Sequence, residues 1–262
     1  MTTLIERGTL IWQNRPNPTK AVYACGGKIA VKIVKGLKDY TEYTSLMYLE
    51  EHCPAAMAPR PHGLIVIGNL SAILMSYIPS ATLASVWASL GVQNKETIRD
   101  ELNRIFMSLR SLKKPNHLPL GGTHGEGCQD NRMQSRRSST PIFDCNAFEN
   151  FQFSNPTYGG SVYVQLLRGL LPANDPVPVF THGDLRLDNI MVDEENEIYH
   201  VSGLIDWQYS GFYPAHHECL KATNTMGTNE DCDWYNYLPE CASPKAHPVR
   251  WLVDRLWDPH VA

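Results

Sequence analysis

Hydrophobic residues in the first third of the chain fall into short runs bounded by turn-forming residues. Runs of this kind are typical of β-strands, and pairs such as Gly26–Gly27 and Gly68–Asn69 suit tight hairpin turns. The expected strands are 9–12, 21–24, 29–34, 63–68 and 71–78. The pattern predicts a small antiparallel sheet near the amino terminus.

A helical period interrupts these strands once. Glu42, Leu46 and Leu49 recur at helical spacing after Asp39, which predicts a helix over residues 40–52 with Asp39 as its cap. Because Glu42 begins the apolar face, we expect it to point inward.

Beyond Pro79 the pattern is mainly helical. Apolar residues alternate at three- and four-residue steps over 95–114, which predicts a core helix with Asn94 as its cap. Shorter helical patterns occupy residues 161–171 and 249–257. The chain is therefore expected to be an α+β protein with two lobes.

We place the amino-terminal, β-rich lobe with its one helix at residues 1–78 and the larger, mainly helical lobe at 79–262. Residues 115–160 form an irregular insertion, of a kind that often contacts substrate or acts as a lid. Its glycine-rich stretch, 121–127, lacks the Gly-Lys-Ser/Thr ending of a P-loop and is expected to be a surface loop.

Candidate chemistry gathers around a third predicted hairpin. Two apolar runs flank the polar turn 194–197; His182, Asp184 and Asn189 precede the first run, and Asp206 follows the second. A hairpin brings these residues to one edge. One carboxylate can orient a hydroxyl group, and an amide with a second carboxylate can hold Mg²⁺ against phosphate oxygens. The arrangement predicts phosphoryl-transfer chemistry.

Lys32 and Glu42 permit two interpretations. A lysine in an apolar strand, followed by a glutamate on the next helix, matches the ion pair that fixes the α- and β-phosphates in kinases. Alternatively, Lys32 faces solvent at alternate spacing, and Asp39 with Glu42 forms a capping box. The residues alone leave both open.

Composition limits the possible partners. The 262 residues are 43% hydrophobic, carry a net charge of −4 and contain no Lys/Arg-rich run, so they give no support to a nucleic-acid binder. No apolar run approaches the length of a membrane span. The seven cysteines are scattered without a CxxC pair, which favours reduced thiols and a cytoplasmic protein.

Taken together, these residues resemble the aminoglycoside phosphotransferase and choline kinase-like family, in a form common among fungal proteins. The resemblance is carried by Lys32 with Glu42 and by the stretches 73–79, 181–192 and 204–214. It implies a bilobal, protein-kinase-like fold. It also implies an enzyme that uses ATP and Mg²⁺ to transfer the γ-phosphate to a hydroxyl group of a small molecule.

The resemblance also implies roles for four residues of the hairpin region. Asp184 would be the catalytic base, and His182 would brace the loop that carries it. Asn189 and Asp206 would bind Mg²⁺. These roles agree with phosphoryl transfer, which depends on positioning and charge neutralisation.

For the nucleotide, the resemblance implies that Lys32, held by Glu42, contacts the α- and β-phosphates. Backbone groups of Ser76 and Ile78 would face adenine. The sequence departs from the family at Gln208, where glutamate is common, and its amino-terminal part has no clear glycine-rich phosphate loop.

Two questions stay open at this level. A cationic acceptor would call for carboxylates near the site, and Glu218, Asp231 and Asp233 are candidates by position. The alternative function is that of a nucleotide-binding or regulatory protein with a kinase fold and little transfer activity.

Overall fold

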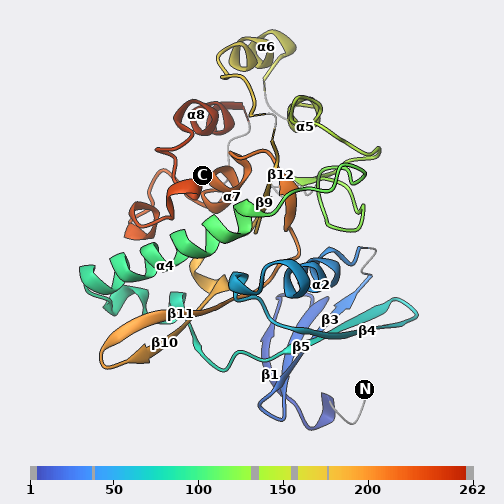
Figure 1. Ribbon diagram of the computed structural model, residues 1–262, viewed down its shortest axis with the longest axis vertical. Helices are drawn as coiled ribbons and strands as arrows, with labels where there is room; N and C mark the ends of the chain where they lie inside the picture. Colours follow the sequence, from blue (N-terminus) through green and yellow to red (C-terminus); the bar gives the residue numbers. More distant parts are fainter. Residues whose placement is uncertain (1–4, 37–38, 131–135, 155–158, 176, 258–262) are drawn as a thin grey trace.

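A five-stranded antiparallel sheet forms the amino-terminal lobe of the computed structural model, which describes residues 5–36, 39–130, 136–154, 159–175 and 177–257. Its strand order is β1-β2-β3-β5-β4, and it lies at the bottom of Figure 1. The strands are β1 (Thr9–Gln13), β2 (Lys20–Cys25), β3 (Ile29–Lys35), β4 (Pro61–Ile67) and β5 (Leu70–Ser76). The predicted sheet is confirmed.

Glycines make the hairpin turns of this sheet possible. Gly26 and Gly27, between β2 and β3, have φ of 60° and 68°, and Gly68, between β4 and β5, has φ of 58°. These left-handed values suit glycine because it lacks a Cβ. The β2–β3 turn sets a register in which Val22 lies opposite Lys32.

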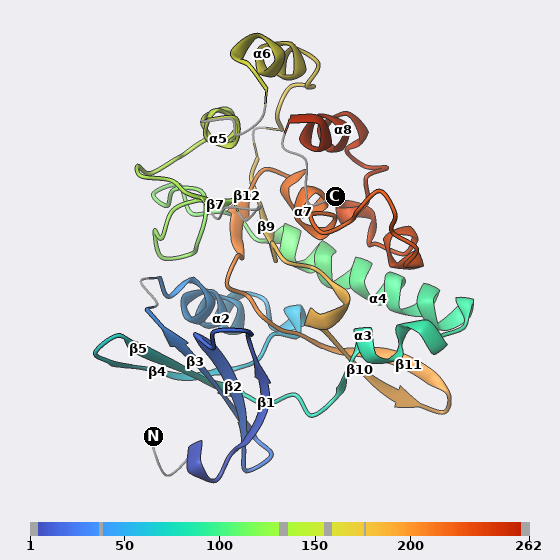
Figure 2. The same cartoon turned by 180° about the vertical axis from the view of Figure 1, so that it is seen from behind.

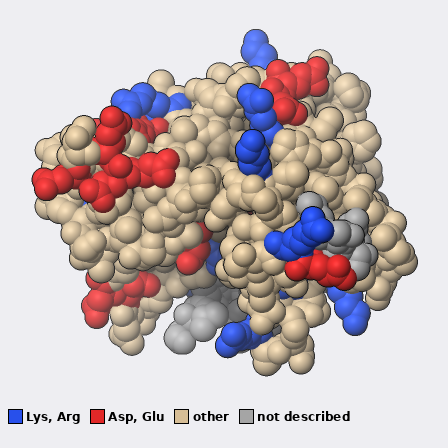
Figure 3. Space-filling view, turned by 90° about the horizontal axis from the view of Figure 1, so that it is seen from below, with Lys and Arg blue, Asp and Glu red and all other residues tan. Residues whose placement is uncertain are grey.

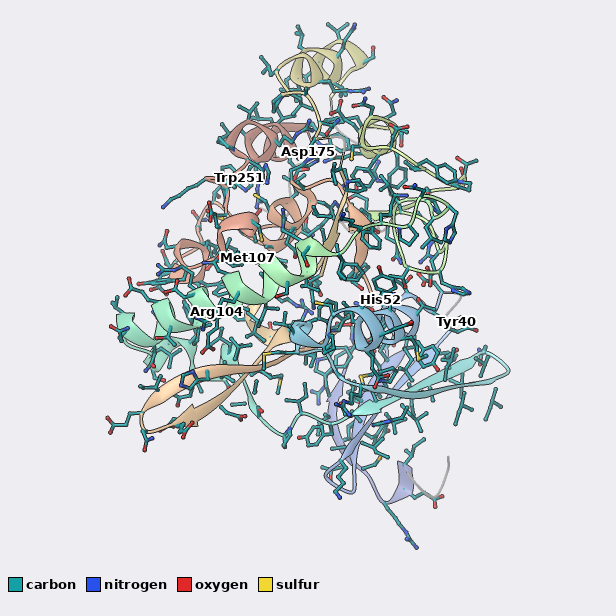
Figure 4. All side chains as sticks on the ribbon, viewed as in Figure 1. Tyr40, His52, Arg104, Met107, Asp175 and Trp251 are labelled. Atoms are coloured by element: carbon teal, nitrogen blue, oxygen red, sulfur yellow. The ribbon has the colours of Figure 1, made fainter. Side chains whose placement is uncertain are left out.

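Helix α2 (Thr41–His52) packs beside the sheet and contacts β4. Its flanking residue Tyr40 and last residue His52 are labelled in Figure 4. The predicted capping is corrected: Tyr40 is the N-cap, and Asp39 lies one residue earlier, where its Oδ1 accepts the N–H of Thr41 at 2.6 Å. Glu42 is buried on the inner face of the helix, as predicted.

Helix α4 (Val92–Ser111) crosses the middle of the molecule. It begins and ends about three residues earlier than predicted, and Asn94 is not its cap. Instead, the Asn94 side chain accepts the N–H of Tyr199 and donates to the carbonyl of Glu197, both at 3.1 Å. These hydrogen bonds join residues about a hundred positions apart, so the local sequence pattern could not indicate them. Met107 is exposed on the outer side of the helix (Figure 4).

The carboxy-terminal lobe builds on two smaller sheets. A three-stranded sheet has the order β11-β10-β6, and β12 pairs with β9. Their strands are β6 (Ala81–Thr82), β9 (Val179–Thr181), β10 (Ile190–Glu195), β11 (Ile198–Leu204) and β12 (Gly211–Tyr213). A further pair is β7 (Gln129–Asp130) with β8 (Arg136–Arg137). The β10–β11 hairpin predicted from the sequence is present.

Helices cover the rest of this lobe, with α5, α6 and α8 at the end far from the five-stranded sheet (Figures 1 and 2). Their bounds are α3 (Leu83–Val86), α5 (Cys145–Gln152), α6 (Ser161–Gly169), α7 (His217–Ala222) and α8 (Pro248–Trp257). Short 3₁₀ turns lie at η1 (Pro54–Ala56), η2 (Trp87–Ser89), η3 (Leu187–Asn189), η4 (Asp233–Asn236) and η5 (Glu240–Ala242). The α+β class is confirmed, and the lobe boundary after residue 78 stays a prediction.

The glycine-rich stretch 121–127 reaches the surface only at its tip, His124 and Gly125, whereas residues 121–123 and Gly127 are buried. Gly121 exchanges backbone hydrogen bonds with Phe212, and a Cβ on Gly121 would lie 2.0 Å from the carbonyl oxygen of Gly127. Glycine is needed at position 121 because its backbone lies directly against the backbones of Gly127 and Phe212. The rest of the insertion 115–160 falls partly outside the described residues.

Two features of the helices and of one face of the surface are plain. Among the described residues, no helix has the length and apolarity needed to span a membrane. Figure 3 shows charged side chains of both signs in separate groups on the face viewed from below, without a continuous basic surface there.

Candidate active site

The β10–β11 hairpin brings the two predicted metal ligands together. Asn189 immediately precedes β10, and Asp206 follows β11 by two residues. Ile190 pairs with Leu204, and the N–H of Ile205 donates to the carbonyl of Asn189 at 2.9 Å. The strand pairing therefore fixes both side chains at one edge of the sheet.

Asp184 lies in the loop between β9 and β10 and is held by its neighbours. Asn189 Nδ2 donates to the Asp184 carbonyl at 2.8 Å and to Asp184 Oδ2 at 3.1 Å, and Arg186 Nε lies 3.6 Å from the same Oδ2. Burial raises the pKa of Asp184 to about 6, while the Arg186 guanidinium opposes the rise. Among the described residues, Asp184 Oδ1 has no hydrogen-bond partner. One oxygen is thus fixed and the other is available.

His182 connects this loop to the segment that carries Asp206. Its ring is fully buried, with Nε2 3.0 Å from the carbonyl of Ile205, and Nδ1 accepts the N–H of Asp184 at 3.2 Å. Burial lowers the pKa of His182 to about 4, so the ring is neutral near pH 7 and its Nε2–H donates to Ile205. The two ring nitrogens of His182 thus contact the backbone of both segments.

Asp206 meets Lys32 from the other lobe. Lys32 Nζ lies 2.6 Å from Asp206 Oδ1 and 2.7 Å from Glu42 Oε2. The ion pair is therefore formed, and Glu42 is not part of a capping box. Although burial opposes both shifts, this pairing raises the pKa of Lys32 and lowers that of Asp206. Asp206 also adopts φ of 65°, a costly backbone conformation for a non-glycine residue.

The backbone N–H groups of the hinge differ in whether they have an acceptor. The N–H of Ser76 donates to the carbonyl of Arg60, and that of Tyr77 donates to the carbonyl of Lys28, both at 2.8 Å. Among the described residues, the N–H of Ile78 has no acceptor. The hinge thus presents a donor where the resemblance implies adenine.

Glu218 has a structural position that the sequence did not indicate. Its fully buried carboxylate accepts the N–H of His182 at 2.7 Å and that of Gly183 at 3.3 Å. It therefore anchors the loop and is not a carboxylate for a cationic acceptor. Asp233 is likewise engaged, since it accepts from Lys95 Nζ at 2.7 Å and from Trp87 Nε1.

Lys20 and Gln208 were also missed as site residues. Lys20 Nζ donates to Gln208 Oε1 at 2.8 Å, close to Asp206. Burial, followed by the nearby Lys32 ammonium, lowers the pKa of Lys20. The signal in the sequence was the two-residue spacing between Lys20 and Val22, which places Lys20 on the same strand face as the partner of Lys32.

The donor set fits Mg²⁺ shared with a phosphate. Within the described residues there is no group of three or more His, Cys, Asp or Glu side chains that could hold a metal by itself. Asn189 points its amide nitrogen at Asp184, which leaves its Oδ1 as an oxygen donor, and Asp206 supplies a carboxylate from the segment that pairs with Asn189. Mg²⁺ commonly takes one or two such protein oxygens and completes its shell with water and phosphate.

The sequence matches the family model described as "Phosphotransferase enzyme family" over residues 41–251. This match covers most of the chain, which therefore belongs to the phosphotransferase enzyme family. A search of curated protein sequences finds no significant match.

Solved structures with the same fold are aminoglycoside phosphotransferases. A thermostable mutant of APH(4)-Ia, in a ternary complex with ADP and hygromycin B, is 15% identical with a TM-score of 0.61, covering 98% of this chain and 89% of its own. The streptomycin–ATP complex of APH(2'')-IIa is 12% identical with a TM-score of 0.58, covering 97% and 82%. An aminoglycoside-3'-phosphotransferase of type VIII is 17% identical with a TM-score of 0.53, covering 97% and 88%. These similarities confirm the bilobal, protein-kinase-like fold.

Proposed function

We propose that this protein is an ATP- and Mg²⁺-dependent phosphotransferase that moves the γ-phosphate to a hydroxyl group of a small molecule. The observation that carries the proposal is a pair of side-chain contact sets, joined by the backbone hydrogen bond from Ile205 to Asn189. Glu42 holds Lys32, Lys32 meets Asp206, and Asn189 holds Asp184. Phosphoryl transfer needs these kinds of groups in one place.

Asp184 is the base in this proposal. Its Oδ2 is fixed by Asn189, so Oδ1 accepts the proton of the acceptor hydroxyl as that oxygen attacks the phosphorus. A pKa of about 6 keeps most of the carboxylate ionised at neutral pH while leaving it basic enough to take a proton. His182 and Glu218 act through the backbone of the loop and position Asp184.

The nucleotide lies between the lobes. Lys32 contacts its α- and β-phosphates, and the free N–H of Ile78 donates to the adenine edge. Asn189 and Asp206 would hold Mg²⁺, which would supply positive charge against the phosphate oxygens. The use of nucleotides by structural neighbours, which were crystallised with ADP or ATP, supports this assignment.

The acceptor is a hydroxyl-bearing small molecule. Support comes from membership of the family and from neighbours that bind hygromycin B and streptomycin. Of the three carboxylates considered for a cationic acceptor, Glu218 and Asp233 are engaged in the fold, and only Asp231 stays a candidate by position.

A phosphorylation screen tests the proposal. A pool of polar metabolites is incubated with γ-labelled ATP, Mg²⁺ and either the parent protein or the Asp184→Asn variant. We expect a labelled small molecule with the parent protein, and none with the variant or after chelation of Mg²⁺. Label transferred equally by parent and variant would contradict the role of Asp184.

A further inference from the structure

A second lysine lies beside Lys32 at the junction of the lobes. Lys20 is the first residue of β2, and Val22, two residues later, pairs with Lys32 of β3. Alternate residues of a strand share a face, and directly paired residues project to the same side. Lys20 and Lys32 therefore project from one side of the sheet. The contact with Gln208 then brings the Lys20 ammonium next to the segment that carries Asp206.

The two lysines differ in how their charge is balanced. Lys32 is held by two carboxylates at 2.6 and 2.7 Å. In the part of the chain that the structure describes, Lys20 Nζ forms no ion pair, and its partner is the neutral amide oxygen of Gln208 at 2.8 Å. The ammonium of Lys20 is thus held in place without direct contact to a carboxylate. A hydrogen bond from an ammonium to an anionic oxygen is roughly twice as strong as one between neutral groups, so a phosphate oxygen competes well with this amide.

The β1–β2 connection explains why an extra cation is needed. Loops that bind phosphate usually do so with backbone N–H groups. Here Pro16 and Pro18 have no N–H to offer. Asn14 Oδ1 accepts the N–H groups of Thr19 at 2.9 Å and Lys20 at 2.7 Å, so these donors are already used. The connection is left with few backbone donors for a phosphate.

We propose that Lys20 is a phosphate-binding residue whose ammonium leaves Gln208 and contacts the phosphate chain of the nucleotide. It supplies the positive charge that the backbone of the β1–β2 connection does not. Gln208 keeps the lysine beside Asp206 until the nucleotide arrives. This inference rests on the proposed function, because it assigns a residue to the nucleotide site of the same enzyme.

Calorimetric titrations with adenosine, ADP and the non-hydrolysable analogue AMP-PNP test the inference. The variants are Lys20→Met, Lys20→Arg and, as a matched control, Lys35→Met, which removes an exposed lysine at the end of β3. We expect Lys20→Met to weaken binding of ADP and AMP-PNP by about ten- to hundredfold, the range for one hydrogen bond to a charged group. Adenosine affinity stays unchanged, Lys20→Arg retains most of the phosphate affinity, and Lys35→Met behaves as the parent.

The outcomes separate this inference from the proposed function. Unchanged ADP affinity in Lys20→Met, or an equal loss for adenosine and ADP, would overturn the role of Lys20 alone. A parent protein that binds neither ADP nor AMP-PNP would overturn the proposed function and this inference with it.

A labelling experiment on the parent protein does not depend on how the variants fold. An amine-reactive acylating reagent is applied with no ligand, with adenosine or with ADP, and the modification of Lys20 is followed by mass spectrometry. We expect ADP to slow the modification of Lys20 about tenfold or more, the effect of one charge-assisted contact, whereas adenosine leaves it unchanged. Equal rates of modification with ADP and adenosine would contradict contact with phosphate.

Discussion

Glu218 shows how a buried side chain prepares the site without touching a substrate. It accepts two backbone N–H groups of the loop that carries Asp184, and burial raises its pKa from 4.5 to about 7. The Arg110 guanidinium and the two hydrogen bonds oppose the rise. Desolvation of the carboxylate therefore exceeds the stabilisation that these partners provide.

This shift predicts how stability changes with pH. Between pH 4.5 and 7 the folded protein holds a proton on Glu218 that the unfolded chain has released, so the free energy of unfolding falls as pH rises. The loss reaches about 3 kcal/mol, an order-of-magnitude figure from the size of the shift. Chemical denaturation of the parent and Glu218→Gln at several pH values measures it. In Glu218→Gln, this fall in the free energy of unfolding between pH 4.5 and 7 should be absent. The control Glu195→Gln, at an exposed position, should show the same fall as the parent.

Identical slopes for the parent and Glu218→Gln would show that the carboxyl group does not titrate in this range. Because every other titrating group is common to both proteins, their difference isolates Glu218.

At the scale of elements, the tight turn at Gly183 decides where Asp184 lies. Gly183 has φ of 77°, and a Cβ there would lie 2.4 Å from the carbonyl oxygen of Tyr209. The loop after β9 thus passes directly against the segment after β11. Only glycine allows this approach with the observed backbone conformation.

Gly183→Ala should therefore destabilise the protein by about 2 kcal/mol or more, from the left-handed backbone and the overlap with Tyr209. Transfer activity should fall with it, because the loop moves. Gly169→Ala is the matched control: nothing lies within 4 Å of its added Cβ at the end of α6, and helix propensity favours alanine. Thermal unfolding of both variants checks the prediction, and a Gly183→Ala variant as stable as the parent would refute it.

The sequence predicted those elements that depend on local pattern. The strands, the three hairpins with turns at 26–27, 68–69 and 194–197, and the inner face of α2 follow from alternation and turn residues, and the structure has them. The cap of α4 and the burial of residues 121–123 and Gly127 did not follow, because Asn94 binds a hairpin about a hundred residues away and Gly121 meets Gly127 and Phe212.

The difference between local and long-range contacts also explains which residues of the site could be predicted from the sequence. Asp184, Asn189 and Asp206 form one short motif, so their proximity was predictable from a hairpin. Lys20 and Gln208 are separated by 188 positions, and the role of Glu218 depends on backbone groups 36 positions away. No local spacing encodes such contacts.

At the scale of the whole molecule, two side-chain contacts connect the lobes beside Asp206 among the described residues. Lys32 reaches Asp206, and Lys20 reaches Gln208. A ligand that binds residues of both lobes stabilises the folded protein in proportion to the logarithm of its concentration over its Kd.

Mg²⁺-ATP should accordingly raise the melting temperature. At a hundred times its Kd the ligand adds about 2.7 kcal/mol, which corresponds to a shift of about 5–10 °C for a chain of this size. A thermal-shift titration measures it, and chelation of the metal should reduce the shift. A melting temperature that does not move up to millimolar Mg²⁺-ATP would contradict nucleotide binding.

The central claim is that Asp184 is the base of a phosphoryl transfer. The most direct measurement is the rate of γ-phosphate transfer to an identified acceptor by the parent and Asp184→Asn, with nucleotide affinity measured on the same samples. We predict that transfer falls by about three orders of magnitude or more, as for removal of a catalytic base, while nucleotide affinity is nearly unchanged. Equal rates in the two proteins, or nucleotide binding without transfer by the parent, would contradict the claim, and the second result would favour a nucleotide-binding protein with a kinase fold.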